Sequence, residues 1–468
     1  MRPFVCLAGA VLAGVLGTPP GAATAASGGA AAAAANRGDH KSGLVVRTDK
    51  GDVRGVRADG VDSFLGIRYA AAPVGVLRWR PPHPAAPWGG VAEATAYGDR
   101  CAAAASSNGP RTEAEDCLFV NVQRPTGLKP SDRRPVYVFI HGGGLVNGSA
   151  NQADMAAIVR RTGVVGVSFN YRLGVLGFLG HAGLTAEAGE SGNYGLMDQQ
   201  AALGWITRNI AAFGGDPRRV TVGGESAGGW SVCAHLVAPG SRGLLSKAMI
   251  QSGSCISRTQ QEAETAGTSF APAVGCGAAA TAVDCLRRTE VARLIDTPAG
   301  RFGFVRETPT LPADPAEAVA SGQFARVPIV IGANRDEGRT FAQGFIDATR
   351  QPTWAYEFAH RTGPGLTPIP GYMWGAGHAA ELAYLFPSFD NGVPIAPTFD
   401  AAERQLATDM KRYWAAFARY GTPNARGLAW WPRYDHPGES MSLRAGGESR
   451  PMSDAQFVAE HQCAFWPP

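Results

Sequence analysis

Residues 220–237 read VTVGGESAGGWSVCAHLV, and this stretch decides the fold. An apolar β-branched run leads directly into Gly224-Glu225-Ser226-Ala227-Gly228, which fits the pattern G-x-S-x-G, and a helical pattern follows at once. Small residues beside Ser226 permit a turn that is too sharp for larger side chains, so the Ser226 hydroxyl is lifted off the sheet edge. The helix N-terminus behind it favours developing negative charge. The stretch predicts a nucleophilic serine on a strand–turn–helix elbow.

A second motif predicts an oxyanion site. His141-Gly142-Gly143-Gly144 directly follows the apolar run VYVFI (residues 136–140). Glycines let backbone N–H groups approach a carbonyl oxygen closely, so we expect the N–H groups of Gly142, Gly143 and Ala227 to form an oxyanion hole. His141 itself is expected to orient the loop and not to act as a base.

The order of the chain predicts where the acid and the base lie, because folds with this elbow place them after the nucleophile in that order. The segment VPIVIGANRDEGRTF (residues 327–341) offers Asp336 and Glu337 as the acid. Four histidines follow it: His360, His378, His436 and His461. His378 is favoured as the base because it lies in the Gly-rich segment GYMWGAGH, just ahead of the helical pattern AAELAYLF.

The flanking sequence predicts the rest of the architecture. Residues 44–69 alternate apolar and polar residues between Gly and Asp turns, which is typical of an antiparallel hairpin region. Short apolar runs then alternate with helical patterns at residues 197–213 and 227–237, which predicts an α/β fold with a mostly parallel sheet. The runs lie at residues 136–140, 164–169, 220–222, 248–251 and 327–331. Composition does not change after residue 42, so a single domain over residues 43–468 is expected.

The composition excludes several functional classes. The chain has 468 residues, 45% of them hydrophobic and 18% charged, which is ordinary for a globular protein. Its net charge is only +4, and the basic residues are scattered as pairs such as Arg160-Arg161. A nucleic-acid partner is therefore not expected. Apart from the N-terminal run, no stretch is long and apolar enough to suggest a membrane span.

The N-terminus predicts export. Arg2 precedes an apolar run over residues 4–16, and residues 23–25 read Ala-Thr-Ala, a cleavage pattern for signal peptidase. We expect residues 1–26 to be a signal peptide, residues 27–42 to be an Ala/Gly-rich linker, and the mature protein to be secreted. Outside the cell, conditions are oxidising. The closely spaced pairs Cys101/Cys117 and Cys276/Cys285 are then natural candidates for disulfides that close short loops. No Cys/His cluster suggests a metal site.

Taken in order, these motifs resemble the type-B carboxylesterase family of cholinesterase-like α/β-hydrolases from about residue 43 to residue 466. Further pieces that carry the resemblance are FLGIRYAAAPVGVLRWRPP, EDCLFVNV, NYRLGVLGFL, GNYGLMDQQAALGWITRNIAAFGGDP, GANRDEG and CAFW. The resemblance implies an esterase that needs no cofactor and uses Ser226, His378 and Glu337. Glu337 is preferred to Asp336 because the family's acid is the Glu of its DEG motif. The same resemblance implies the two disulfides Cys101–Cys117 and Cys276–Cys285, an Arg78–Glu115 ion pair, and supporting positions for Glu225 and Ser252, although Ser252 could equally be an ordinary strand-end serine.

Three departures from the family bear on substrate and activity. The segment between Cys101 and Cys117 contains no aromatic residue, where cholinesterases carry a choline-binding Trp, so a quaternary-ammonium substrate is not expected. Leu145 and Trp230 replace the family's usual Phe and small residue, and either reshape the acyl pocket or repack behind it. Relatives also place a block of helices between acid and base, whereas Glu337 and His378 are only 41 positions apart here. Cys463 would then have lost its usual partner.

The sequence thus predicts a carboxylesterase that acts on small or short-acyl esters. A cholinesterase-like binding module without turnover, an enzyme impaired by the missing block, and an amidase or thioesterase with the same triad are the alternatives. The oligomeric state and the physiological ester are not predicted.

Overall fold

The computed structural model describes residues 44–337, 351–361, 375–389, 395–435 and 438–461. The expected signal peptide and linker, His436 and Cys463 lie outside these described residues. No helix in the described part of the chain has the length and apolarity that crossing a bilayer requires.

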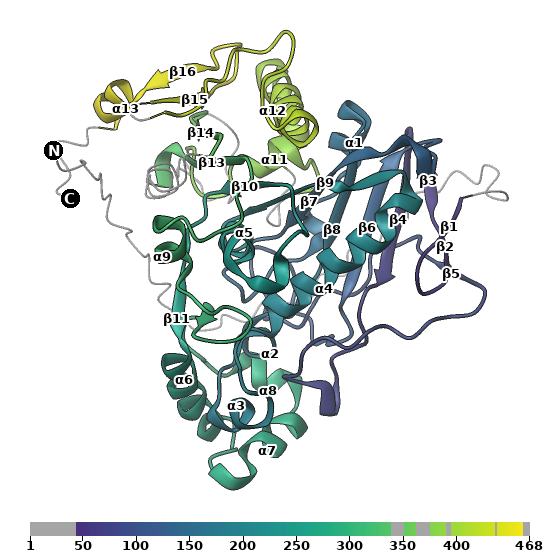
Figure 1. Cartoon of the computed structure of the whole chain (residues 1–468), viewed down its shortest axis with the longest axis vertical. Helices are drawn as coiled ribbons and strands as arrows, with labels where there is room; N and C mark the ends of the chain where they lie inside the picture. The colour runs from purple at the N-terminus through teal and green to yellow at the C-terminus, as the bar shows by residue number, and fades with distance from the viewer. Residues whose placement is uncertain (1–43, 338–350, 362–374, 390–394, 436–437, 462–468) are drawn as a thin grey trace, which may run out of the picture.

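One large twisted sheet forms the centre of the molecule (Figure 1). It has 11 strands, in the spatial order β16 (Arg450–Ser453), β15 (Glu439–Leu443), β14 (Thr353–Phe358), β13 (Ile329–Asn334), β10 (Lys247–Gln251), β9 (Gly215–Glu225), β7 (Arg134–Ile140), β8 (Val165–Phe169), β6 (Phe119–Pro125), β4 (Val61–Arg68) and β3 (Val56–Ala58). Every neighbouring pair from β8 to β15 is parallel, and the outer pairs at both edges are antiparallel. The predicted mostly parallel sheet is confirmed.

Two small sheets flank the large one. The first consists of β1 (Val45–Arg47), β2 (Asp52–Arg54) and β5 (Val91–Glu93), and the second pairs β11 (Ser257–Thr259) with β12 (Phe304–Arg306). The predicted N-terminal hairpin region is therefore divided between two sheets: β1 and β2 form one antiparallel hairpin, while β3 and β4 form the edge of the large sheet.

Helices cover both faces of the large sheet. They are α1 (Ala156–Thr162), α2 (Gly174–Phe178), α3 (Ala182–Ala188), α4 (Tyr194–Asn209), α5 (Ala227–Val237), α6 (Gln260–Ala273), α7 (Ala282–Arg288), α8 (Val291–Asp296), α9 (Pro315–Ala320), α11 (Leu382–Leu385), α12 (Ala401–Tyr420) and α13 (Asp454–Glu460). The expected helix at residues 227–237 forms with the same bounds, and the one at 197–213 forms as α4 and a following 3₁₀ turn.

Successive apolar side chains of β7 point to opposite faces of the sheet, which explains why helices cover both faces. Val136, Val138 and Ile140 point into the core beneath α4 and α5, whereas Tyr137 and Phe139 point into a second core beneath α1, α11 and α12. Side chains of successive strand residues face opposite sides, so an unbroken apolar strand needs helices on each side. One side of α12 belongs to the second core and therefore packs against the sheet. It carries Leu406, Met410, Trp414 and Phe417.

The shortened connection between acid and base joins two adjacent strands. β13 pairs directly with β14 in parallel register, from Ile329 opposite Thr353 to Asn334 opposite Phe358. Residues 338–350, which link them, lie outside the described part of the chain. The segments on either side of this link therefore form strands that pair directly with each other.

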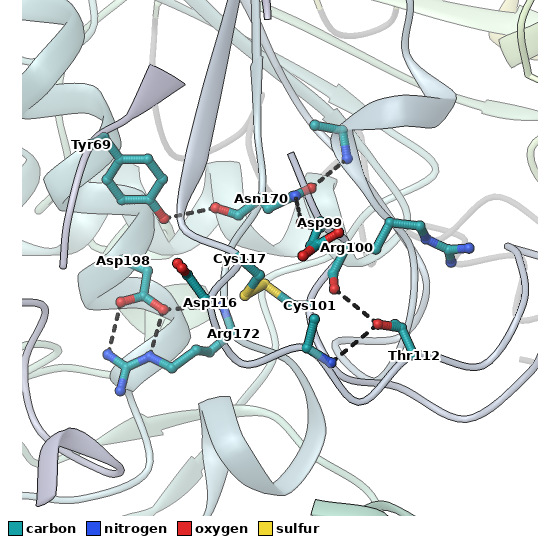
Figure 2. Close-up of a disulfide and its surroundings, with 12 residues drawn as sticks. Tyr69, Asp99, Arg100, Cys101, Thr112, Asp116, Cys117, Asn170, Arg172 and Asp198 are labelled. Atoms are coloured by element: carbon teal, nitrogen blue, oxygen red, sulfur yellow. Dashed lines mark hydrogen bonds and ion pairs between the residues drawn. A yellow bond between two sulfur atoms is a disulfide. The ribbon is translucent and has the colours of Figure 1, made fainter. Parts of the chain in front are cut away.

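Among the described residues, three disulfides connect loops to this framework. Cys101–Cys117 and Cys276–Cys285 close the two short loops expected from spacing, and Cys233–Cys255, which the sequence left open, joins α5 to the segment after β10. Near Cys101–Cys117, Arg172 donates to buried Asp198 from Nε at 2.7 Å and from Nη2 at 2.8 Å (Figure 2). The implied Arg78–Glu115 ion pair is also present, with 2.6 Å between Arg78 Nε and Glu115 Oε1.

Candidate active site

Ser226 lies on a strained turn between β9 and α5. Its backbone has φ 55° and ψ −121°, a left-handed conformation that a non-glycine residue adopts only when its surroundings enforce it. Its N–H donates to the carbonyl of Gln251 on β10 at 2.9 Å. A Cβ at Gly228 would lie 2.0 Å from the carbonyl oxygen of Ile140, so this position must be glycine for α5 to approach β7. The turn directs the Ser226 hydroxyl into a cavity.

His378 lies between Ser226 and Glu337. Its Nε2 is 2.8 Å from Ser226 Oγ, and its Nδ1 contacts Oε2 of Glu337. Ser226 comes from the end of β9, and Glu337 from the 3₁₀ turn η7 (Arg335–Glu337) that follows β13. Residues separated by 152 and 41 positions thus form one connected hydroxyl–imidazole–carboxylate arrangement.

The other oxygen of Glu337 is held in place by its neighbours. Oε1 accepts a hydrogen bond from the backbone N–H of Asn334 at 2.6 Å and another from Ser252 Oγ. Ser252 therefore orients the carboxylate that contacts His378. Asp336, the other candidate acid, instead accepts from Arg361 Nε at 3.1 Å and from the N–H of Ala376 at 2.8 Å.

His436 lies outside the described residues, and the other two candidate histidines contact carboxylates away from Ser226. His360 Nε2 lies 3.2 Å from Oε1 of Glu403, and His461 Nε2 lies 2.5 Å from Oε1 of buried Glu357. His141 is buried, its Nδ1 lies 2.9 Å from the carbonyl of Gly142, and its ring stacks on Tyr171. Burial lowers the pKa of His141 to about 4, so it stays neutral and suits the role of orienting the glycine loop.

Two of the three expected oxyanion donors line the same cavity. Gly142 and Gly143 line it together with Ser226 and His378. Ala227 is the first residue of α5, and the N–H groups of a first helical turn have no acceptor within the helix. Gly143 has φ 105°, and a Cβ there would lie 2.3 Å from the carbonyl oxygen of Asn147, so the loop needs glycine at this position.

Buried carboxylates determine the electrostatics around His378. Glu225 is almost fully buried, and its Oε1 lies 3.3 Å from His378 Nε2. Burial raises the pKa of Glu225 to about 8, although His378 counteracts the shift. Burial alone would lower the pKa of His378, but Glu225 and Glu337 favour the imidazolium and raise that pKa above its ordinary value.

The sequence reasoning missed a third buried carboxylate, Glu381. It accepts hydrogen bonds from Asn334 Nδ2 at 2.6 Å and from Gln251 Nε2 at 3.1 Å. Burial raises the pKa of Glu381 to about 7, with a further contribution from Glu337. A lone acidic residue within the apolar pattern AAELAYLF, three positions after His378, was the available signal.

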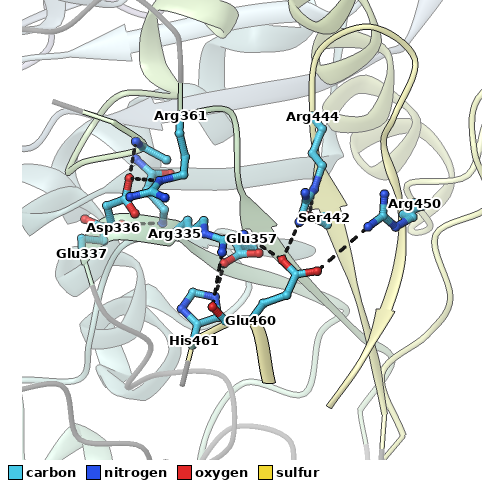
Figure 3. A network of polar contacts seen from close by, with 12 residues as sticks. Arg335, Asp336, Glu337, Glu357, Arg361, Ser442, Arg444, Arg450, Glu460 and His461 are labelled. Atoms are coloured by element: carbon cyan, nitrogen blue, oxygen red, sulfur yellow. Dashed lines mark hydrogen bonds and ion pairs between the residues drawn. The ribbon is translucent and has the colours of Figure 1, made fainter. Parts of the chain in front are cut away.

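A network of ion pairs braces the turn that carries Glu337 (Figure 3). Glu460, at the end of α13, accepts from Arg335 Nη1 at 2.7 Å and from Arg444 Nη2 at 2.7 Å. Arg335 is the first residue of η7, so the network links the last described helix to the acid-bearing turn.

The cavity above Ser226 has a volume of about 400 Å³. Phe139, Leu382, Phe386 and Phe389 give it an apolar side. Leu145 is fully buried in the main core and Trp230 packs against the same core, which favours repacking behind the pocket for both replacements. Among the described residues, no group of three or more His, Cys, Asp or Glu side chains is arranged to hold a metal ion.

Comparison with known proteins places the chain among esterases. The sequence profile described as "Carboxylesterase family" matches residues 42–351 and 345–466. An acylcarnitine hydrolase of Rattus norvegicus is 32% identical over 90% of this chain and 89% of its own length. The para-nitrobenzyl esterase of Bacillus subtilis (strain 168) is 31% identical over 85% of this chain and 94% of its own.

Solved esterase structures superpose on this chain as well. A PNB esterase superposes with a TM-score of 0.77 at 29% identity and covers 90% of this chain and 99% of its own. A carboxylesterase of Geobacillus stearothermophilus superposes with a TM-score of 0.76, also at 29% identity, over 91% of this chain and 100% of its own. These neighbours share the α/β-hydrolase fold that the elbow sequence predicted.

Proposed function

The chain belongs to the carboxylesterase family, and from this premise we propose that it hydrolyses carboxylic esters by acyl transfer through Ser226, His378 and Glu337. One observation carries the assignment of residues: His378 connects the Ser226 hydroxyl to the Glu337 carboxylate inside a cavity lined by Gly142 and Gly143. A serine hydroxyl is a weak nucleophile unless a positioned base removes its proton.

In the acylation step, His378 Nε2 takes the proton of Ser226 as Oγ attacks the ester carbonyl carbon. Negative charge then develops on the carbonyl oxygen, where the N–H groups of Gly142, Gly143 and Ala227 stabilise it. His378 returns the proton to the departing alcohol, and an acyl-enzyme is left on Ser226. Glu337, held by Ser252 and Asn334, orients the imidazole and stabilises its charged form.

Deacylation repeats the sequence with water. His378 removes a proton from the attacking water, the same N–H groups hold the second tetrahedral intermediate, and the acid leaves as Ser226 regains its proton. We expect short-acyl esters to be the preferred substrates, because the cavity of about 400 Å³ lies at the lower end of the usual size range of ligand pockets.

We also propose that residues 43–468 form a single carboxylesterase domain, exported by a signal peptide at residues 1–26. The three disulfides are compatible with this, because disulfides persist in oxidising compartments. Intact-mass analysis of the secreted protein tests it, and recovery of the full-length chain from the cytoplasm alone would contradict it.

Hydrolysis of p-nitrophenyl acetate and butyrate by the mature protein tests the esterase assignment. We expect turnover by the wild type and its loss in Ser226→Ala. A well-folded wild type without turnover would favour the binding-module alternative.

A further inference from the structure

The polar part of the cavity lining contains a chain of three side-chain amides. Gln152 Nε2 donates to Asn108 Oδ1 at 3.4 Å, and Asn108 Nδ2 donates to Asn147 Oδ1 at 2.7 Å. All three residues line the cavity that holds Ser226 and His378. Asn108 comes from the loop closed by Cys101–Cys117, whereas Asn147 and Gln152 follow the glycine loop in sequence.

One amide nitrogen and one amide oxygen, at the two ends of this row of amides, take part in no hydrogen bond of the row. Within the described part of the protein, Asn147 Nδ2 and Gln152 Oε1 have no hydrogen-bond partner. An amide carries both a carbonyl oxygen and an NH₂ group, so reversing all three side chains would exchange the two ends without removing either function. Whichever way the three amides are oriented, this row of side chains offers a donor at one end and an acceptor at the other.

The amides are fixed relative to the reacting atoms. The N–H of Asn147 donates to the carbonyl of Gly143 at 3.0 Å, so Asn147 moves with the glycine loop that faces Ser226. Arg100 Nη2 donates to the carbonyl of Asn108 at 2.8 Å, and Ser106 and Gly109 exchange two backbone hydrogen bonds of 3.0 Å around it. A substrate group that binds these amides is therefore held at a defined distance from Ser226.

The charged residues that line the cavity restrict the kind of substrate group that can bind the amides. No lysine or arginine is among the described residues that line the cavity, and the one imidazolium in the lining, His378, is already paired with Glu337 and Glu225, so an anionic group finds no unpaired cation there. Glu225 is the one carboxylate among the described residues of the lining, and it lies against His378. A hydroxyl group both donates and accepts, and it carries no charge to desolvate.

We propose that the amides of Asn108, Asn147 and Gln152 form a subsite for a neutral hydroxyl group carried by one half of the ester. The proposal rests on the proposed esterase function. The apolar side of the cavity, formed by Phe139, Leu382 and Phe386 among others, then receives the small apolar part of the same substrate. The preferred substrates are short hydroxylated esters, not plain alkyl esters.

Two pairs of esters of matched shape test this subsite, one for each half of the substrate. The first pair is 3-hydroxypropyl butyrate and butyl butyrate, and the second is ethyl 3-hydroxybutanoate and ethyl 3-methylbutanoate. In at least one pair we expect the hydroxylated ester to have about tenfold higher kcat/KM, which corresponds to about 1.4 kcal/mol. The variants Asn147→Leu and Gln152→Met, which keep side-chain size, should abolish that preference.

The controls separate this subsite from the esterase function itself. Turnover of p-nitrophenyl acetate, which carries no hydroxyl group, shows whether each variant still hydrolyses esters, and the preference itself is measured as the ratio of kcat/KM within each pair. Gln405→Met, on the exposed side of α12 where Gln405 donates to Asp409, should leave every ratio unchanged. Equal or reversed preference in both pairs, or preference that survives in both variants, would overturn the subsite while p-nitrophenyl acetate is still hydrolysed. No turnover of any ester would overturn the esterase function as well.

Discussion

Asn334 donates a hydrogen bond of 2.6 Å from its side-chain amide to the buried carboxylate of Glu381. The same amide donates to the carbonyl of Gly377 at 2.7 Å, and Gln251 on β10 donates to the other oxygen of Glu381. Asn334 ends β13, three residues before Glu337, and Glu381 lies three residues after His378. A buried polar network thus joins the segment that carries Glu337 to the segment that carries His378.

Removal of the Glu381 carboxyl should destabilise the protein. Glu381→Ala would leave one N–H of the Asn334 amide and one N–H of the Gln251 amide buried without an acceptor, at a cost of about 1–3 kcal/mol for each group. Glu381→Gln retains one acceptor and should lose less. Denaturant unfolding of the two variants measures the loss in free energy of unfolding. A Glu381→Ala variant as stable as the wild type would show that the network does not stabilise the protein.

The ionisation of Glu381 should make stability depend on pH. Burial raises its pKa from 4.5 to about 7, so the folded state binds the proton more tightly than the unfolded state does. The free energy of unfolding must then fall as pH rises from the unfolded pKa toward the folded one. We expect the wild type to lose stability relative to Glu381→Gln between about pH 5 and pH 7. A difference between them that does not change with pH would contradict this.

The activity should rise with pH through the titration of His378. Its pKa is raised above the ordinary value of 6.5 by Glu225 and Glu337, which outweigh the opposite effect of burial. Only the neutral imidazole can accept the Ser226 proton, so the midpoint in kcat/KM should lie above 6.5. Glu225→Gln removes a buried carboxyl whose own pKa is about 8 and which favours the imidazolium once it is ionised, so the midpoint should move to lower pH. An unmoved midpoint would exclude Glu225 as a source of the shift.

The ion pairs of Glu460 should contribute to the position of Glu337. Glu460→Gln weakens the contacts with Arg335 and Arg444, which are partly buried, and we expect a loss of up to about 1 kcal/mol in stability with a lower kcat/KM. A double-mutant cycle with Arg335→Met measures the coupling of the pair. Asp52→Asn, which breaks an exposed pair with Arg47, is the matched control and should leave kcat/KM unchanged.

The sequence predicted the elements whose chemistry is local. The elbow around Ser226, the bounds of α5 and the glycine loop at residues 141–144 all follow from short motifs in which neighbouring residues determine one another. The chain order of nucleophile, acid and base left four histidines as the base. The Gly-rich segment just ahead of a helical pattern then favoured His378, which lies beside Ser226.

What the sequence did not predict depends on contacts between distant segments. Gln251 and Glu381 are 130 positions apart, and Asn108 and Asn147 are 39 apart, so no local pattern connects them. The Cys233–Cys255 disulfide likewise depends on how β10 places its following loop against α5. Polar pairs of this kind form wherever the fold brings a donor and an acceptor together, which the residue types alone do not disclose.

Covalent trapping of Ser226 tests the central claim most directly. The purified protein is incubated with diethyl p-nitrophenyl phosphate, which phosphorylates an activated serine, and the modified peptide is identified by mass spectrometry. We predict a single diethylphosphoryl group on Ser226, a matching loss of p-nitrophenyl butyrate hydrolysis, and slow labelling in His378→Ala. Hydrolysis that persists after Ser226 is fully labelled, or labelling at another residue that abolishes it, would contradict the account.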